Sequence, residues 1–440
     1  MKMNYSIPKT IRFFIFLVVL ANTTYAQDLL TVEDAVRIAL ENNYEIRLAK
    51  NELQIDTEGV SLGYAGILPG VQASITDNNN IQDISQVRSD GTRRELNSGK
   101  NNNLSYGVNL DWTIFDGFGM FARYDQLKEL QNLGEAELQQ AVLGRVANVM
   151  TTYFEIIQQK QELSALDSTL VISQQRVEFA QNRFTIGKAS KLEVLNAQVD
   201  LNTDQTLLLR QIELYANTKT QLNEIMARDI ETAFTVEDAM LVDESLQLGE
   251  LEALAKDQNP EIQAQLINKS IAELEFKRVR ANRYPVLVGS TGYNFNESES
   301  SLGFTSSSST QGFNYGFTAS VNIFDGFTQN RDEKIAKLQI QNSNIVIEQQ
   351  LQTLQSQLAT AYQTYLTNVR LIDLEQRNEA IAKENLEITL EKFKIGTIPT
   401  IEFRTAQLNY INAKVRYSEA TYQAKLSEIT LKQLAGNLSF

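Results

Sequence analysis

The pentapeptide Ile-Phe-Asp-Gly-Phe occurs twice in this chain, at Ile114–Phe118 and again at Ile323–Phe327. The two copies lie 209 residues apart (323 − 114), and the same offset relates RFTIG at Arg183–Gly187 to KFKIG at Lys392–Gly396 without a gap. One pentapeptide can recur by chance, but collinear matches at a single offset indicate an internal duplication. The sequence therefore predicts a tandem repeat of one unit: helix, strand, loop, strand, long helix, turn and return helix.

The duplication sets the expected domain boundaries. We assign residues 27–228 to the first repeat, residues 251–440 to the second, and the acidic stretch 229–250 to a connector in the equatorial region between them. Upstream of the strands, Pro69 matches Pro285 at an offset of 216 (285 − 69), so the halves differ in length at one place only. A length change confined to one place indicates a surface loop, since packed elements tolerate insertion poorly.

The N-terminus has the layout of a secretory signal peptide. Lys2, Lys9 and Arg12 precede the nine-residue apolar run Phe13–Ala21, and small residues follow it. A run of this length is too short to span a bilayer, so we expect cleavage rather than a retained anchor. Residues 1–26 are therefore predicted to be a signal peptide, and the mature chain to begin at Gln27.

Composition argues against catalysis. The formal net charge is −14 at pH 7, which disfavours nucleic acid as a partner, and the chain has no histidine and no cysteine. Without histidine, the commonest general base and metal ligand is missing. The carboxylates Glu193, Asp200, Glu402 and Glu419 lie on predicted helices with no nucleophile or metal ligand nearby. We expect no catalytic residue, no metal site and no cofactor.

Apolar and polar residues alternate from Leu104 to Phe115, and again in the equivalent stretch 313–323. Shorter strands begin after Pro69 and Pro285 and complete two hairpins, with exposed loops expected at 77–103 and 296–311. A soluble sheet packed on a core shows the same alternation. Strand lengths of about nine to eleven residues, aromatic residues near the strand ends and the export signal favour a transmembrane β-barrel instead. The residues expected to face the lipid are Tyr106, Val108, Leu110, Trp112, Tyr315, Phe317 and Val321.

The number of strands predicts a shared barrel. Four strands per chain cannot close a barrel, and open sheet edges are not tolerated in hydrocarbon because their amide groups would be unpaired. Two chains would supply eight strands, whose interior side chains fill, whereas three supply twelve and leave a lumen. Because the inward residues are polar, we expect a homotrimer around a water-filled pore.

Long helices follow each strand pair. The stretches from Gly119 to about Asn182 and from Thr328 to about Glu391 contain no proline, and apolar residues recur in steps of three and four that are typical of coiled coils. Some sixty helical residues span on the order of 95 Å. Each helix is expected to reverse at a glycine turn, and the two turns to form a tip. The predicted tip residues are Arg183, Gly187, Glu193, Lys392, Gly396 and Glu402.

The chain resembles the outer membrane efflux protein family, the TolC-like channels. The resemblance lies in the repeat, the two FDGF strings, the two tip segments and the opening LTVEDAVRIALENN. The resemblance implies a trimer with a twelve-stranded barrel in the outer membrane, continuous with a helical barrel in the periplasm. It implies docking at the tip to a periplasmic adaptor (membrane fusion protein) bound to an inner-membrane pump. Acidic rings narrow the entrance of such tunnels. Glu402 matches one acidic position, whereas Thr405 and Arg404 depart from the pattern.

A periplasmic coiled-coil adaptor or structural protein is the alternative. Its helical hairpins would bind partners in the same way, but it would not need two strand pairs with apolar outer faces. The resemblance leads us to expect a passive channel component of a tripartite efflux or type I secretion system, which conducts substrates from the pump to the exterior. The cargo is not identified by the sequence.

Overall fold

The computed structural model describes residues 28–301 and 305–438. The predicted signal peptide, residues 1–26, lies outside the described part. The elements are β1 (Asp28–Leu29), α2 (Val32–Asn42), α3 (Tyr44–Gly59), β2 (Gly70–Val87), β3 (Arg93–Phe115), α4 (Gly119–Thr185), α5 (Lys191–Ile225), β4 (Phe234–Thr235), α6 (Leu248–Gln258), α7 (Pro260–Ala281), β5 (Val286–Ser300), β6 (Ser307–Ser320), α8 (Thr328–Lys394) and α9 (Thr400–Leu434).

The internal duplication is visible in the elements themselves. The long helices α4 and α8 have 67 residues each, and the return helices α5 and α9 have 35 each. Asn43 and Asn259, which are equivalent at the offset of 216, cap α3 and α7 in the same way. Each side-chain oxygen accepts from the N–H groups of the second and third helical residues, at 2.9 and 3.2 Å. The predicted structural repeat is confirmed at the level of single hydrogen bonds.

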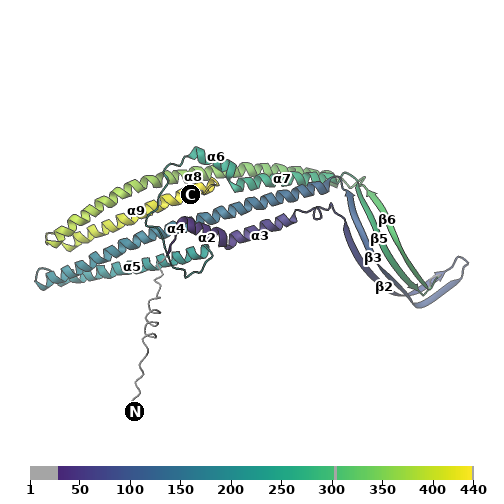
Figure 1. Cartoon of the computed structure of the whole chain (residues 1–440), viewed down its shortest axis with the longest axis horizontal. Coiled ribbons are helices and arrows are strands. Elements are labelled where there is room, and N and C mark those ends of the chain that lie inside the picture. Colours follow the sequence, from purple (N-terminus) through teal and green to yellow (C-terminus); the bar gives the residue numbers. More distant parts are fainter. Residues whose placement is uncertain (1–27, 302–304, 439–440) are drawn as a thin grey trace, which may run out of the picture. The chain divides into compact units, whose positions relative to one another are not determined.

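The chain divides into two compact units, and each contains segments of both repeats. We call them the sheet unit, residues Leu48–Gln140 and Asn259–Leu354, and the hairpin unit, which contains the remaining described residues. In the sheet unit the strands form one antiparallel sheet in the order β2-β3-β5-β6 (Figure 1). Both predicted hairpins are present, and the pairing of β3 with β5 joins them into one sheet.

The expected loops are mostly strand. β2 continues to Val87 and β3 begins at Arg93, so the region 77–103 is a long ladder with a short turn, and Asn78 pairs with Asn103. Likewise β5 runs to Ser300 and β6 begins at Ser307, within the expected loop 296–311. Asparagine and glycine have low strand propensity, which is why the sequence suggested loops. Pairing with the neighbouring strand satisfies the backbone and overrides that local preference.

The hairpin unit contains the apolar core, which gathers α2, α4, α5, α9 and the connector. Tyr153 is fully buried there, and its hydroxyl donates to the Leu30 carbonyl at 2.8 Å. Val149 and Ile156 of α4, which are seven residues apart, lie in the same core. The connector contributes Phe234, because β4 pairs in parallel with β1, a pairing that the sequence did not suggest.

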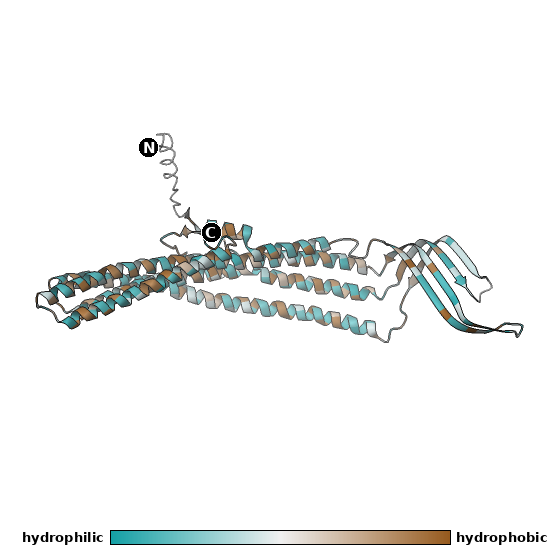
Figure 2. Ribbon diagram, turned by 90° about the horizontal axis from the view of Figure 1, so that it is seen from below, coloured by the Kyte–Doolittle hydropathy of each residue, from teal (hydrophilic) through white to brown (hydrophobic). Residues whose placement is uncertain are grey.

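Apolar and polar residues alternate along the helices of both hairpins, as Figure 2 shows. This banding is the pattern of helices that pack on one side and are solvated on the other. Within residues 28–301 and 305–438, no helix is both long enough and apolar enough to cross a bilayer.

Candidate functional site

The two tip turns have the same backbone. We define them as residues 183–193 and 392–402. Gly187 and Gly396 both have left-handed backbones, with φ of +72° and +81°. In the first turn the Lys188 N–H donates to the Arg183 carbonyl at 2.8 Å, and in the second the Thr397 N–H donates to the Lys392 carbonyl at 3.0 Å. This hydrogen bond ends a helix at a left-handed residue, a conformation that glycine adopts without steric cost.

Of the predicted tip side chains, the structure brings together those of the first repeat. Arg183 Nη1 lies 3.7 Å from Glu193 Oε1. The Thr400 hydroxyl, which belongs to α9 of the second repeat, donates to the same carboxylate. Lys392 and Glu402 are exposed and lie outside this group. The first-repeat turn is therefore tied to the second-repeat hairpin at the tip.

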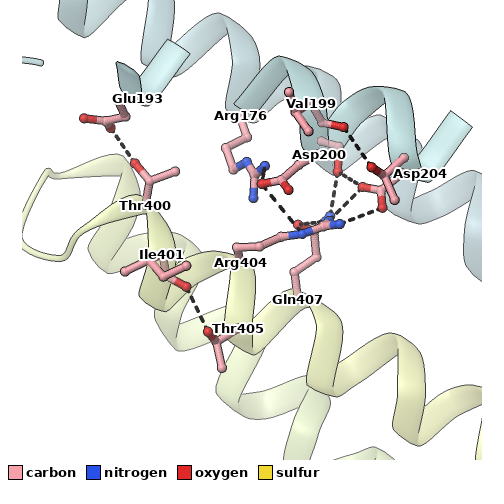
Figure 3. Close-up of polar contacts among 12 residues, drawn as sticks. Arg176, Glu193, Val199, Asp200, Asp204, Thr400, Ile401, Arg404, Thr405 and Gln407 are labelled. Carbon is pink, nitrogen blue, oxygen red and sulfur yellow. Dashed lines mark hydrogen bonds and ion pairs between the residues drawn. The ribbon is translucent and has the colours of Figure 1, made fainter. Parts of the chain in front are cut away.

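A second contact between the two helical hairpins surrounds Arg404, which lies on α9 four residues after Thr400 (Figure 3). Arg404 extends from α9 and is 7% exposed. Its Nη1 and Nη2 donate to Asp204 Oδ2 and Oδ1 at 2.7 and 2.8 Å, a two-point ion pair with a carboxylate on α5 that is 1% exposed. Asp204 also accepts from the Ser173 hydroxyl of α4 at 2.5 Å. Three helices from both repeats thus meet at one buried carboxylate.

Two further charges complete this group. Arg176 of α4 pairs with Asp200 of α5, and Arg404 Nε lies 3.9 Å from the same Asp200 carboxylate. We call Arg176, Asp200, Asp204 and Arg404 the four-charge cluster; its formal charges sum to zero. Gln407 extends the network, since its amide donates to the Ser173 hydroxyl at 2.9 Å.

Arg176 is the least satisfied member of the cluster. It is 1% exposed, and its Nε and Nη1 have no hydrogen-bond partner within the described residues. Burial lowers the pKa of Arg176, an effect that the neighbouring Asp200 charge opposes. An arginine nevertheless stays protonated at neutral pH. The cluster therefore holds a buried guanidinium whose lost hydration is only partly replaced by hydrogen bonds. This incomplete replacement costs free energy in the paired arrangement.

The sequence drew attention to two members of this cluster separately, Asp200 as a helical carboxylate and Arg404 as a departure from the family pattern, but not to their meeting. The signal lay in α5, whose buried positions Ala197, Asp204, Gln211 and Thr218 recur every seven residues. A polar residue in the buried seam of a coiled coil requires a partner. The partners of Asp204 lie 31 and 200 residues away in the sequence, so only the fold reveals them.

In the sheet unit, the register aligns the apolar positions of all four strands on one face. Leu110 lies between Val71 of β2 and Thr291 of β5, and Thr291 pairs in turn with Tyr315 of β6. This face has a depression of about 280 Å³, which is lined by Leu110, Trp112, Tyr315 and Phe317 among others. Tyr106 and Val108 occupy the same face by register. Val321, named with them from the sequence, lies one residue beyond the end of β6.

The opposite face carries an amide ladder. The Asn294 side chain donates to Asn109 Oδ1 at 3.0 Å and to Asn314 Oδ1 at 2.9 Å, across three strands. Glycines make room for it: a Cβ on Gly107 would lie 2.1 Å from Asn294 Oδ1. One face of the sheet is therefore apolar and the other polar, as required of a wall between lipid and water.

Comparison with known proteins agrees with this geometry. The outer membrane efflux protein family matches residues 35–228 and 251–437. The chain is 22% identical to the outer membrane protein TolC of Vibrio cholerae serotype O1, over 96% of this chain and 93% of that protein. It is 20% identical to the proteases secretion protein PrtF of Dickeya chrysanthemi, over 92% and 88%.

A solved structure has the same fold. The CmeC outer membrane channel of Campylobacter jejuni superposes with a TM-score of 0.77 at 17% identity, covering 99% of this chain and 93% of that one. The relatives are channels and secretion proteins, which favours a channel over the alternative of a periplasmic adaptor. The chain therefore belongs to the outer membrane efflux protein family and is an outer-membrane channel for efflux or secretion, with its long helices in the periplasm.

Proposed function

We propose that three copies of this chain pool their sheets into one twelve-stranded barrel, with residues 27–228 and 251–440 acting as two equivalent repeats joined by the connector 229–250. The support is the sheet order, in which β2 and β6 each have one edge without a strand partner in the described chain. Such edges are not tolerated in hydrocarbon. The apolar face that contains Tyr106, Val108, Leu110, Trp112, Tyr315 and Phe317 would then contact outer-membrane lipid.

The tip turns are the proposed entrance, where a periplasmic adaptor brings cargo from an inner-membrane pump. The turns are exposed, and both repeats present the same backbone there, so an adaptor with repeated hairpins would find equivalent docking positions. Glu402 lies exposed next to the second turn and is available to line the entrance. The protein then contributes a passive path, and the choice of cargo belongs to the pump.

One observation suggests how the entrance could be gated. The four-charge cluster links the α4/α5 hairpin to the α8/α9 hairpin through a buried ion pair. We infer that the cluster holds the two hairpins together while the entrance is closed, and that opening separates Arg404 from Asp204. An ion pair suits this task because it is lost over a short displacement, and both groups regain water once they are exposed. Adaptor binding would shift the population toward the separated arrangement.

The test is single-channel conductance of the purified protein in planar bilayers. Arg404→Ala leaves Asp204 buried without its partner, and we expect a several-fold higher open probability than that of the unaltered protein. The matched control is Arg416→Ala on the same helix, where the arginine is half exposed and pairs with Glu375 at 3.0 Å. This control should conduct like the parent, since an exposed pair contributes little.

If Arg404→Ala forms trimers with the parent's conductance and open probability, the cluster is not the gate. If the unaltered protein is monomeric and gives no conductance at all, the proposal of a barrel shared by three copies fails. The two outcomes are distinguishable because the first concerns a variant and the second concerns the parent.

A further inference from the structure

The two Asp-Gly-Phe turns have the same backbone but different surroundings. Gly117 and Phe118 both have left-handed backbones, with φ of +73° and +70°, and their equivalents Gly326 and Phe327 have +70° and +64°. A Cβ on Gly117 would lie 2.3 Å from the Ala281 carbonyl oxygen, so the first turn is packed tightly against the end of α7. A Cβ on Gly326 would meet nothing within 4 Å.

The second turn is also unusually exposed. Ile323 is 95% exposed and Phe324 75% exposed, and the turn borders a cavity of about 850 Å³ between it and the end of α7. A left-handed phenylalanine costs on the order of 1–2 kcal/mol, and the second repeat adopts one without the contact that accompanies it in the first. Apolar surface exposed in this way indicates a missing partner.

The duplication identifies the missing partner. Ala281 and Tyr284, which contact the first turn, correspond at the upstream offset of 216 to Ala65 and Leu68. These residues directly precede β2, just as Ala281 and Tyr284 precede β5. Within one chain β2 and β6 are the opposite edges of the sheet, so the end of β6 and the start of β2 belong to different copies when they meet.

We infer that the turn Ile323–Phe327 of one copy packs against Ala65–Leu68 of a second copy, as Ile114–Phe118 packs against Ala281–Tyr284 within a chain. The inference rests on the proposed shared barrel and specifies its contact. It also accounts for the end of β6 at Ser320, whereas β3 continues through the equivalent residues to Phe115. Residues Val321–Phe324 become strand when the second copy supplies their hydrogen-bond partners.

The two repeat offsets also predict the strand register between copies. Within a chain, Asp111 pairs with Ser290 and Phe115 with Leu287. Shifting the first member of each pair by +209 and the second by −216 pairs Ser320 with Ser74 of the second copy, and Phe324 with Val71 of the second copy. Opposed residues of antiparallel strands have Cα atoms about 4.5–5.5 Å apart, which is within the range that a disulfide bridges.

The experiment uses engineered cysteine pairs in the full chain, which has no cysteine of its own. The pair Ser320→Cys/Ser74→Cys tests the strand register, and Phe324→Cys/Val71→Cys tests the turn. Both should give disulfide-linked multimers on non-reducing gels after oxidation in membranes. The matched controls are Ser320→Cys/Thr76→Cys and Phe324→Cys/Ala73→Cys, which move one partner by two residues on the same face. Diagonal neighbours lie about 7–8 Å apart, so the controls should link at least tenfold less.

The possible outcomes distinguish the docked turn from the shared barrel on which it rests. Linking of both designed pairs supports the docked turn. Linking of the first pair without the second shows a barrel whose turns are not docked, which overturns the inference. Failure of both pairs in a protein that still runs as a trimer overturns the register while the barrel stands. Failure of both in a monomeric protein overturns the barrel.

Discussion

The apolar core and the four-charge cluster occupy successive stretches of α4, but they are built from opposite kinds of side chain. The core contains Val149, Tyr153 and Ile156, all fully buried. Further along the same helix, Arg176 of the cluster is equally buried, as is Ser173, which donates to Asp204. A buried apolar side chain contributes about 1.5–3 kcal/mol to folding and requires no particular partner. A buried ion pair contributes little net free energy, but the loss of one member is costly.

The comparison indicates a division of roles along one helix. Apolar packing is non-directional and tolerates small shifts, so the core stabilises one arrangement whatever the state of the entrance. The cluster depends on direction and on complete pairing, which is why we propose that it is formed when the entrance is closed and broken when the entrance is open. A channel that must stay assembled while its tip opens requires both kinds of contact.

The largest effect is expected in the core. Tyr153→Ala removes a fully buried ring and its hydrogen bond to Leu30, and should lower the free energy of unfolding by about 3–5 kcal/mol. Thermal unfolding of the detergent-purified protein, followed by circular dichroism, measures this loss. The control is Tyr44→Ala on α3, where the ring is 65% exposed and the loss should stay within about 0.5 kcal/mol. Equal losses in the two variants would remove the distinction between core and surface.

The next prediction concerns the four-charge cluster, in which leucine replaces first one and then both members of the buried ion pair. Arg404→Leu alone leaves the Asp204 carboxylate buried without its main partner and should cost about 3–5 kcal/mol. Arg404→Leu/Asp204→Leu replaces both members by apolar groups and should recover most of that stability. We expect the double variant to conduct less than the single variant, because apolar contact now holds the hairpins together. A double variant as unstable as the single one would contradict this account of the cluster.

A smaller effect is expected at the tip turns. Gly187→Val with Gly396→Val forces two β-branched residues into left-handed backbones, at a cost of roughly 1–2 kcal/mol each. Efflux, measured as resistance to an exported toxin, should be abolished while trimers stay in the membrane. The control is Gly144→Val in α4, a glycine around which an added Cβ would meet nothing within 4 Å. Normal resistance in the double variant would refute the role assigned to the turns.

The smallest effect concerns Glu162, which lies on α4 between the core and the cluster. Burial raises the pKa of Glu162 above its ordinary value of 4.5, and the charge of Glu419 adds to the shift. A carboxyl with a raised folded-state pKa destabilises the fold when it ionises, so stability is lower at neutral pH and is regained as the pH falls through that pKa. Glu162→Gln should therefore stabilise the protein at pH 7–8 by about 0.5 kcal/mol, the scale of an ordinary surface change.

The measurement is a pair of unfolding curves at pH 8 and near pH 4. The gain from Glu162→Gln should be present at the higher pH and vanish at the lower, where the native carboxyl is itself protonated. A gain of equal size at both values would show that its cause is not ionisation.

Much of the fold was readable from the sequence, and the exceptions have a common cause. The long helices, the hairpins and the glycine turns rest on patterns within a few residues of one another, and the duplication rests on matching strings 209 residues apart. The limits of the strands could not be predicted from such local patterns. Asn78 and Asn103 have a weak local preference for strand and adopt it because they pair with each other. Val321 was expected in a strand, yet β6 ends one residue earlier, and β6 lies at the edge of the sheet that the described residues form.

The sequence by itself determined the repeat, the class of fold and the alternation that separates a lipid face from a water face, because periodicity is a local property of the chain. Only the tertiary structure decided that Arg176, Asp204 and Arg404 share one buried site. These residues come from three helices in two repeats, and no local pattern encodes which of them will meet. Their meeting depends on the packing of one helical hairpin against another, which is where the function of the entrance is proposed to lie.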